Sequence, residues 1–393
     1  MRKHNALLKS ARLRKSWTAE FVSGQVGVSR DTYIRWEAGM QTPRHSSLNA
    51  LCRVFGMSPA ELGFADLADK KAPEHNAGAR SKRIASTNIP SLDQEQLDPS
   101  EALTLWAMGL ASCWQLYMMG GQEELTQLLP VYLTNLNKPT LQPGPDQQPA
   151  ARLMAQAYQL SALLAMQRGD FVAAQLNGTQ ALVYSQLAKD ANLYIASQIR
   201  LASIFSACKR VGAALHAYND ALRRAISARE TLSPVLHSWV FAGLSEIQAS
   251  MGRKQEAINF LQLAFALFPD KPENDPCASY AQCDHSMLFL YEGLVFLRLG
   301  RPKNAWEALA QIDDMKPKPP ERVRTEFLKH KTYTALILGN MIQSCIYLEA
   351  TVKAAQAINS DLIFGEVYAL YEHMLALWGQ EARVRELARL FQK

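Results

Sequence analysis

The sequence predicts an all-α chain with two folded parts joined by a linker. Three observations predict it: two short amphipathic segments near the N-terminus, a repeating plan of small residues further on, and an excess of positive charge that is confined to the first part. Residues 1–64 hold ten Lys/Arg and four Asp/Glu, an excess equal to the net charge of +6 of the whole chain. The predicted parts are a domain at 1–67, a flexible linker at 68–98 and a helical domain at 99–393.

The two amphipathic segments lie within residues 17–37, on either side of Gly27-Val28-Ser29. A glycine-containing turn between two short helices predicts a helix-turn-helix, in which the second helix enters the DNA major groove. Tyr33 and Trp36 fall on the apolar face of that second helix, and the opposite face is polar. A helix that reads DNA needs this division between a braced face and a hydrogen-bonding face.

These residues resemble the Cro/C1 (xenobiotic-response-element type) helix-turn-helix family over roughly residues 5–64. The matching pieces are Leu13-Arg14, Trp17-Thr18, Gly27 to Arg30, Thr32, Arg35 to Glu37, Gly39, Pro43, Leu48, Leu51 and Gly56 to Leu62. The resemblance implies a five-helix, lambda-repressor-like domain. Thr18 and Ser29 are suited to cap the second and third helices, Gly39 to end the third, and Ser58-Pro59-Ala60-Glu61 to open the fifth.

Roles follow from the resemblance position by position. Arg30, Asp31 and Arg35 match base-edge contacts, since arginine can bind guanine O6/N7 and a carboxylate can accept from cytosine N4. Asp31 has an alternative role as an N-terminal helix charge. The positions that match phosphate contacts, including the caps whose helix amides face the backbone, are Thr18, Ser29, Thr32 and Arg44. Arg12 and Glu37 match an internal pair and are expected to be structural.

The implied partner is double-stranded DNA. One such domain covers one half-site, so we expect a homodimer on a pseudo-palindrome with its two recognition helices about 34 Å apart. Ala19 departs from the glutamine that many relatives carry there, which weakens the expectation of tight autonomous binding.

Residues 99–393 resemble the tetratricopeptide repeat, in which small residues let antiparallel helices pack closely. Alanine anchors at 174, 214, 257 and 305 give a period of 40–48 residues, longer than the usual ~34. We attribute the excess to longer helices or loops, notably Pro269–Asp275 and Lys316–Pro320. Leu103–Leu136 and Phe364–Phe391 are predicted as the first and last helix pairs, and Pro139–Pro149 as a loop.

Such an α-solenoid presents a concave inner wall that holds peptides or protein ligands. By register with the family, the ligand-facing candidates are Gln159, Leu163, Met166, Ile199, Arg200, Ser203, Glu246, Tyr291, Leu294, Arg298 and His330. The predicted ligand-binding residues among them are Gln159, Arg200, Ser203, Glu246 and Arg298. The alternative for each is packing or exposure to water. A Cro/C1 domain joined to a repeat domain also resembles bacterial regulators that sense short peptides.

Other classes of function find little support in the sequence. There is no phosphate loop, nucleophile elbow or zinc-protease motif, so we expect no enzyme and no cofactor. The spacing of Cys277, Cys283 and His285 matches no common zinc pattern, so no metal site is expected. Without a membrane-spanning run or a signal peptide, the expected location is cytoplasmic. The alternative function is a protein-interaction adaptor with a secondary DNA anchor.

Overall fold

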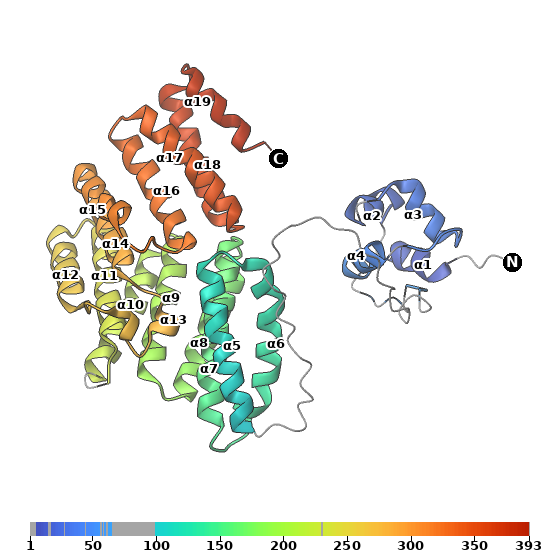
Figure 1. Cartoon of the computed structure of the whole chain (residues 1–393), viewed down its shortest axis with the longest axis horizontal. Helices are drawn as coiled ribbons and strands as arrows, with labels where there is room; N and C mark the ends of the chain where they lie inside the picture. The colour runs from blue at the N-terminus through green and yellow to red at the C-terminus, as the bar shows by residue number, and fades with distance from the viewer. Residues whose placement is uncertain are drawn as a thin grey trace. The chain divides into compact units, whose positions relative to one another are not determined.

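The computed structural model describes residues 5–14, 17–26, 28–43, 45–55, 57, 59, 62–64, 99–228 and 231–392 (Figure 1). The chain divides into two compact units, Met1–Pro90 and Ser91–Lys393. The predicted linker, 68–98, lies outside the described residues. The two units are therefore considered separately, as the N-terminal domain and the repeat domain.

The described part of the N-terminal domain forms four helices around a small core. The helices are α1 (Ala6–Arg14), α2 (Ala19–Val26), α3 (Arg30–Glu37) and α4 (His45–Phe55). Tyr33 and Trp36 of α3 are buried against apolar residues of α1, α2 and α4, and Leu62 and Phe64 close the core. The apolar face predicted for the recognition helix is confirmed.

The predicted helix ends are present wherever they are described. The Thr18 hydroxyl accepts from the amide of Phe21 at 3.1 Å, and the Ser29 hydroxyl accepts from the amide of Thr32 at 3.3 Å. Gly39 follows α3 with φ of 65°, a left-handed conformation in which other residues are strained. Gly27 and most of the predicted fifth helix (Ser58, Ala60 and Glu61) fall outside the described residues.

The repeat domain is built of antiparallel helix pairs that stack side by side (Figure 1). The pairs are α5 (Pro99–Met118) with α6 (Gln122–Leu141), α7 (Gln147–Gln167) with α8 (Phe171–Leu187), α9 (Ala191–Ala207) with α10 (Val211–Ser227), α11 (Pro234–Ser250) with α12 (Lys254–Leu267), α14 (His285–Arg298) with α15 (Pro302–Asp314), α16 (Glu321–Ile337) with α17 (Met341–Ala357), and α18 (Asp361–Trp378) with α19 (Ala382–Glu386). A short helix, α13 (Ala278–Ala281), lies between α12 and α14. No helix in the described ranges is long and apolar enough to span a membrane.

The alanine anchors predicted from the sequence occupy one structural position. Each is the fourth residue of the second helix of its pair, and Ala174, Ala214, Ala257 and Ala305 are all fully buried. A small side chain there lets the two helices approach closely. The repeating plan is confirmed, and it places equivalent turns before α8, α10, α12 and α15.

The longer period has two sources. Between Ala174 and Ala214, helices of 17 residues joined by three-residue turns account for the spacing of 40. Between Ala257 and Ala305, residues 268–284 connect α12 to α14 and include α13. The predicted loop at Pro139–Pro149 was too long: helix continues to Leu141 and resumes at Gln147. Pro149 fits the first turn of α7, where its missing N–H needs no helical partner.

The inner layer of the domain consists of α7, α9, α11, α14 and α16, each of which contacts the next. This layer is not open along its length. Helix α5 packs on α7, α13 and α16, and α13 also contacts α11. Hydrogen bonds join the ends of the stack: the Gln122 side chain donates to the Ile358 carbonyl at 2.7 Å, and the Ser360 hydroxyl donates to Gln167 Oε1 at 2.6 Å. The open concave wall expected from the repeat pattern is thus partly covered by the chain itself.

Candidate functional site

The exposed surface of α3 carries the charged side chains predicted to read DNA. Arg30, Asp31 and Arg35 are all exposed, while Tyr33 and Trp36 on the opposite face are buried. Arg30 Nε lies 3.4 Å from Oε1 of Glu20 on α2, and both side chains are more than half exposed. An exposed ion pair of this kind contributes little to stability. Arg30 is therefore only weakly held by Glu20.

A bidentate ion pair holds α3 in place from behind. Arg12 Nε and Nη2 donate to the two carboxylate oxygens of Glu37 at 2.7 and 3.0 Å, and Nη1 donates to the Trp17 carbonyl at 3.0 Å. The Arg12 and Glu37 side chains are only 13% and 9% exposed. Hydrogen bonding to Glu37 raises the pKa of Arg12 despite burial. The pair ties α1, the start of α2 and the end of α3 together, as its predicted structural role requires.

Three of the predicted phosphate-contacting residues lie at the N-termini of α2 and α3. The hydroxyls of Ser29 and Thr32 lie 2.8 Å apart at the N-terminus of α3, and Thr18 occupies the same place at α2. Free amides at helix N-termini attract anions, which suits both positions to the DNA backbone. Arg44 lies outside the described residues.

Two of the predicted ligand residues in the repeat domain are buried. The Gln159 amide donates to the Ser197 hydroxyl at 2.9 Å, and its oxygen accepts from Arg200 Nε at 3.4 Å. The Arg200 guanidinium lies over the rings of Trp114 and Trp239, at 4.7 and 5.1 Å from their centroids. Both residues lie on the inner layer as predicted, but α5 and α13 cover them. In this structure they contact the chain itself.

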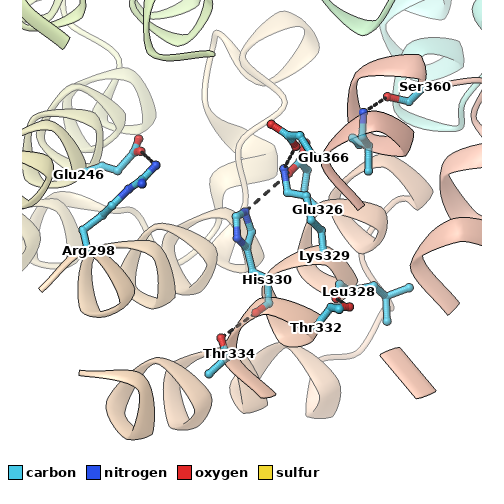
Figure 2. Close-up of polar contacts among 11 residues, drawn as sticks. Glu246, Arg298, Glu326, Leu328, Lys329, His330, Thr332, Thr334, Ser360 and Glu366 are labelled. Carbon is cyan, nitrogen blue, oxygen red and sulfur yellow. Dashed lines mark hydrogen bonds and ion pairs between the residues drawn. The ribbon is translucent and has the colours of Figure 1, made fainter. Parts of the chain in front are cut away.

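The other three predicted residues are more accessible: Ser203 and Glu246 are partly buried, and Arg298 is exposed. The Ser203 hydroxyl donates to the Ile199 carbonyl within its own helix at 3.0 Å. Glu246 of α11 faces Arg298 of α14, with 3.9 Å between Oε1 and Nη2 (Figure 2). Burial raises the pKa of Glu246, and the Arg298 charge opposes that rise. The structure brings this pair together on adjacent inner-layer helices.

A second polar cluster on α16 surrounds His330, which was predicted to face the ligand, but sequence analysis missed its other members. Lys329 Nζ lies 2.6 Å from carboxylate oxygens of both Glu326 and Glu366, and His330 Nε2 lies 3.7 Å from Glu326 (Figure 2). Burial alone would lower the pKa of Lys329, but the two carboxylates outweigh it and raise that pKa. The spacing of 326, 329 and 330 places all three on one helix face. Glu366, from α18, could not be assigned to them from sequence.

His330 predicts a pH dependence of stability. Burial and the Lys329 charge lower its pKa from 6.5 to about 3, although Glu326 opposes the shift. Because the unfolded chain then binds a proton that the folded chain does not, folding should weaken as pH falls below about 6.5, by roughly 1.4 kcal/mol per pH unit. Urea unfolding at pH 7.5 and 5.5 should show a loss about 1–1.5 kcal/mol larger for the native chain than for His330→Gln. His216→Gln, at an exposed position, is the matched control; equal losses in all three chains would contradict the assignment.

Arg322, at the start of α16, is a further residue that sequence analysis missed. Its Nε donates to the Tyr117 carbonyl of α5 at 3.0 Å, and its guanidinium lies 3.9 Å from the centre of the Tyr117 ring. Nη1 and Nη2 are buried with no hydrogen-bond partner in the described part of the chain. Burying N–H donors without a partner lowers the stability of the fold. Residues that lower stability in this way are typical of functional sites. No local sequence signal marks this arginine, since its environment comes from a helix about 200 residues earlier.

The cysteines near α13 are packed in the protein interior. Cys277 and Cys283 are both buried, and the Tyr280 hydroxyl donates to Cys277 Sγ at 3.0 Å. Within the ranges the structure describes, no three His, Cys, Asp or Glu side chains are grouped to hold a metal ion.

Comparison with known proteins bears on the N-terminal domain. Residues 6–63 match the family model described as a helix-turn-helix domain. No curated protein matches the chain. Among solved structures, the crystal structure of Bacillus thuringiensis PlcR in complex with the peptide PapR7 and DNA has 13% sequence identity and a TM-score of 0.37, covering 86% of this chain and 99% of that chain. The family match and the arrangement of α1 to α4 lead to one conclusion: the chain carries an N-terminal helix-turn-helix domain.

Proposed function

We propose that this chain is a sequence-specific DNA-binding transcriptional regulator whose repeat domain binds a signal, such as a peptide, or mediates dimerisation. The observation that carries the proposal is the α3 surface, where exposed Arg30, Asp31 and Arg35 project from a helix braced by Tyr33 and Trp36. Arginines on a rigid helix are suited to bidentate bonds with guanine in the major groove. The basic excess of residues 1–64 adds phosphate attraction in the same domain.

A homodimer is part of the proposal. The eight residues of α3 can read only one half-site, and two such domains about one DNA turn apart gain affinity and specificity together. Sedimentation of the complex with a selected DNA fragment should give two chains per operator. One chain per operator would remove the dimer from the proposal.

The signal would bind on the inner layer of the repeat domain. Charged side chains on adjacent helices support this placement, because they offer specific contacts to a polar ligand. Glu246 and Arg298 are only loosely paired, and Arg322 has two donors without a partner in the described part of the chain. Ser203 lies on the same layer. Any effector must bind one arrangement of the domain better than the other if it is to change DNA binding.

Truncation of both α3 arginines tests the function directly. Arg30→Ala/Arg35→Ala should lower the preference for selected over random DNA about thirty-fold to twenty-thousand-fold, since each bidentate guanine contact contributes about 1–3 kcal/mol of discrimination. The measurement is selection of bound genomic fragments followed by competition gel shifts at one stated salt concentration. Because both side chains are exposed, the domain should keep its fold.

The matched control is Arg253→Ala/Arg301→Ala, which removes two exposed arginines from the repeat domain. It should leave selectivity unchanged. If the α3 variant selects the same fragments as the native chain, the regulator proposal is wrong. If the native chain itself shows no sequence preference, the adaptor becomes the better interpretation.

A further inference from the structure

The connection between α12 and α14 differs from every other connection between helix pairs of the repeat domain. Residues 268–284 form it, whereas the other pairs are joined by three to six residues. Within it, α13 contacts α5 and α11, so the connection enters the inner side of the domain. Cys277, Tyr280, Ala281 and Cys283 are all at most 8% exposed. A loop of this kind normally runs over the surface, because its backbone groups need water or partners.

Both ends of this inserted stretch are fastened by carboxylates. At the start, Asp275 accepts from the Ser233 hydroxyl at 2.8 Å, from the Val235 amide at 3.2 Å and from the Cys277 amide at 2.8 Å. At the end, Asp284 caps α14 by accepting from the amides of Ser286 and Met287. These contacts hold residues 275–284 in place.

The centre of the stretch is held through its backbone. Arg200 Nη2 donates to the Tyr280 carbonyl at 2.9 Å and lies 3.4 Å from the Ala281 carbonyl. The guanidinium is enclosed by Trp114 and Trp239, and no carboxylate of the described residues pairs with it. Burial lowers the pKa of Arg200 to about 10, so the charge is poorly compensated where it lies. Neutral carbonyls are weaker partners for arginine than a carboxylate, which binds its fork in two charge-assisted bonds.

We propose that residues 275–284 occupy, in cis, a peptide-binding site centred on Arg200, and that the effector is a short peptide whose C-terminal carboxylate replaces the carbonyls of Tyr280 and Ala281. The contacts that Arg200 makes to this stretch are to main-chain oxygens, so the site reads a peptide end more than a particular side chain. Gln159 belongs to the same site, because its side-chain oxygen accepts a hydrogen bond from Arg200 Nε. The inference rests on the proposal that the repeat domain binds a signal.

Displacement of residues 275–284 would change the surroundings of α5, the first helix after the predicted linker. Helix α5 contacts α13 and supplies Trp114, and it is the first helix after residues 65–98. A peptide that removes α13 from this contact therefore changes the packing of α5.

Two native thiols report on the proposal in the full-length chain. The probe is a synthetic peptide with the sequence of residues 275–281, serine replacing Cys277, made with a free C-terminus or a C-terminal amide. The free acid should raise the alkylation rates of Cys277 and Cys283 about ten-fold, and the amide should need about ten-fold higher concentration for the same effect. Buried Cys345, on α17, lies outside this stretch and should keep its rate, which mass spectrometry resolves site by site. In Arg200→Gln the preference for the free acid should disappear.

A variant that weakens the attachment of residues 275–284 tests whether they compete with the peptide for the site at Arg200. Asp275→Ala should raise the basal alkylation of Cys277 and Cys283 about ten-fold and tighten peptide binding by the same factor, because the open site is more often available. Asp270→Ala, at an exposed position of the same connection, is the control and should do neither. If neither the native chain nor Asp275→Ala responds to the free acid, the proposal is overturned, and so it is if Cys345 reacts in parallel with Cys277. No DNA is present in these assays, so their failure leaves the DNA-binding proposal intact.

Discussion

Replacing Glu37 with alanine is expected to unfold the N-terminal domain and abolish DNA binding, although the Glu37 side chain is buried away from the exposed arginines of α3. The change leaves Arg12 buried with its Nε and Nη2 donors unpaired. Breaking a buried pair in this way costs about 3–5 kcal/mol. A domain of some 60 residues has a total stability of only about 3–9 kcal/mol, so the loss removes much or all of it.

Hydrogen exchange on the full-length chain measures this result. Amides of α1 to α4 should lose protection in Glu37→Ala, while the repeat domain serves as an internal standard. Glu20→Ala is the matched control, because Glu20 is 75% exposed and its pair with Arg30 contributes little. The double variant Arg12→Met/Glu37→Leu should recover part of the lost protection, since it leaves no buried charge. Equal protection of α3 in the native chain and in Glu37→Ala would contradict the structural role of the pair.

The N-terminal domain was predictable in detail because its rules are local. A cap acts three residues ahead, so Thr18 and Ser29 could be assigned from their own neighbourhoods. Helical spacing separates Tyr33 and Trp36 from Arg30 and Arg35 without knowledge of any other element. The pairing of Glu37 with Arg12 could be predicted only from the family resemblance, because the two residues are 25 positions apart and no periodicity links them.

In the inner layer of the repeat domain, local rules do not predict the contacts that decide which side chains are covered. The register assigned Gln159 and Arg200 to the correct helix faces, but not what would cover those faces. Arg200 finds its carbonyl partner 80 residues later, on α13, and Arg322 finds one 205 residues earlier, on α5. Neither pairing leaves a local trace in the sequence. The connection 268–284 was recognised as extra length and for its cysteines, but nothing in the sequence showed that Cys277 and Cys283 are buried.

Gly243→Ala is expected to destabilise the repeat domain by about 3 kcal/mol or more, against the usual benefit of alanine in a helix. Gly243 lies in the middle of α11, where glycine itself costs about 1 kcal/mol relative to alanine. A Cβ atom there would lie 2.1 Å from Cζ and 2.2 Å from Cε1 of Tyr218. Tyr218 is 2% exposed and packed within α10, so its ring cannot move aside without disturbing the core.

Urea unfolding of the full-length chain provides the measurement, and Gly365→Ala provides the control. Gly365 lies within α18, and a Cβ atom added to it would have no heavy atom within 4 Å beyond its own helix backbone and chain neighbours, so alanine should stabilise the chain by about 0.5–1 kcal/mol. The two substitutions are chemically identical and differ only in what the new methyl group meets. Tyr218→Leu should restore part of the stability of Gly243→Ala, so the double variant should be more stable than the two single changes added together. If Gly243→Ala instead stabilises the chain as Gly365→Ala does, the close packing of α10 on α11 is not as the structure has it, and the position of Glu246 one turn further along α11 loses its support.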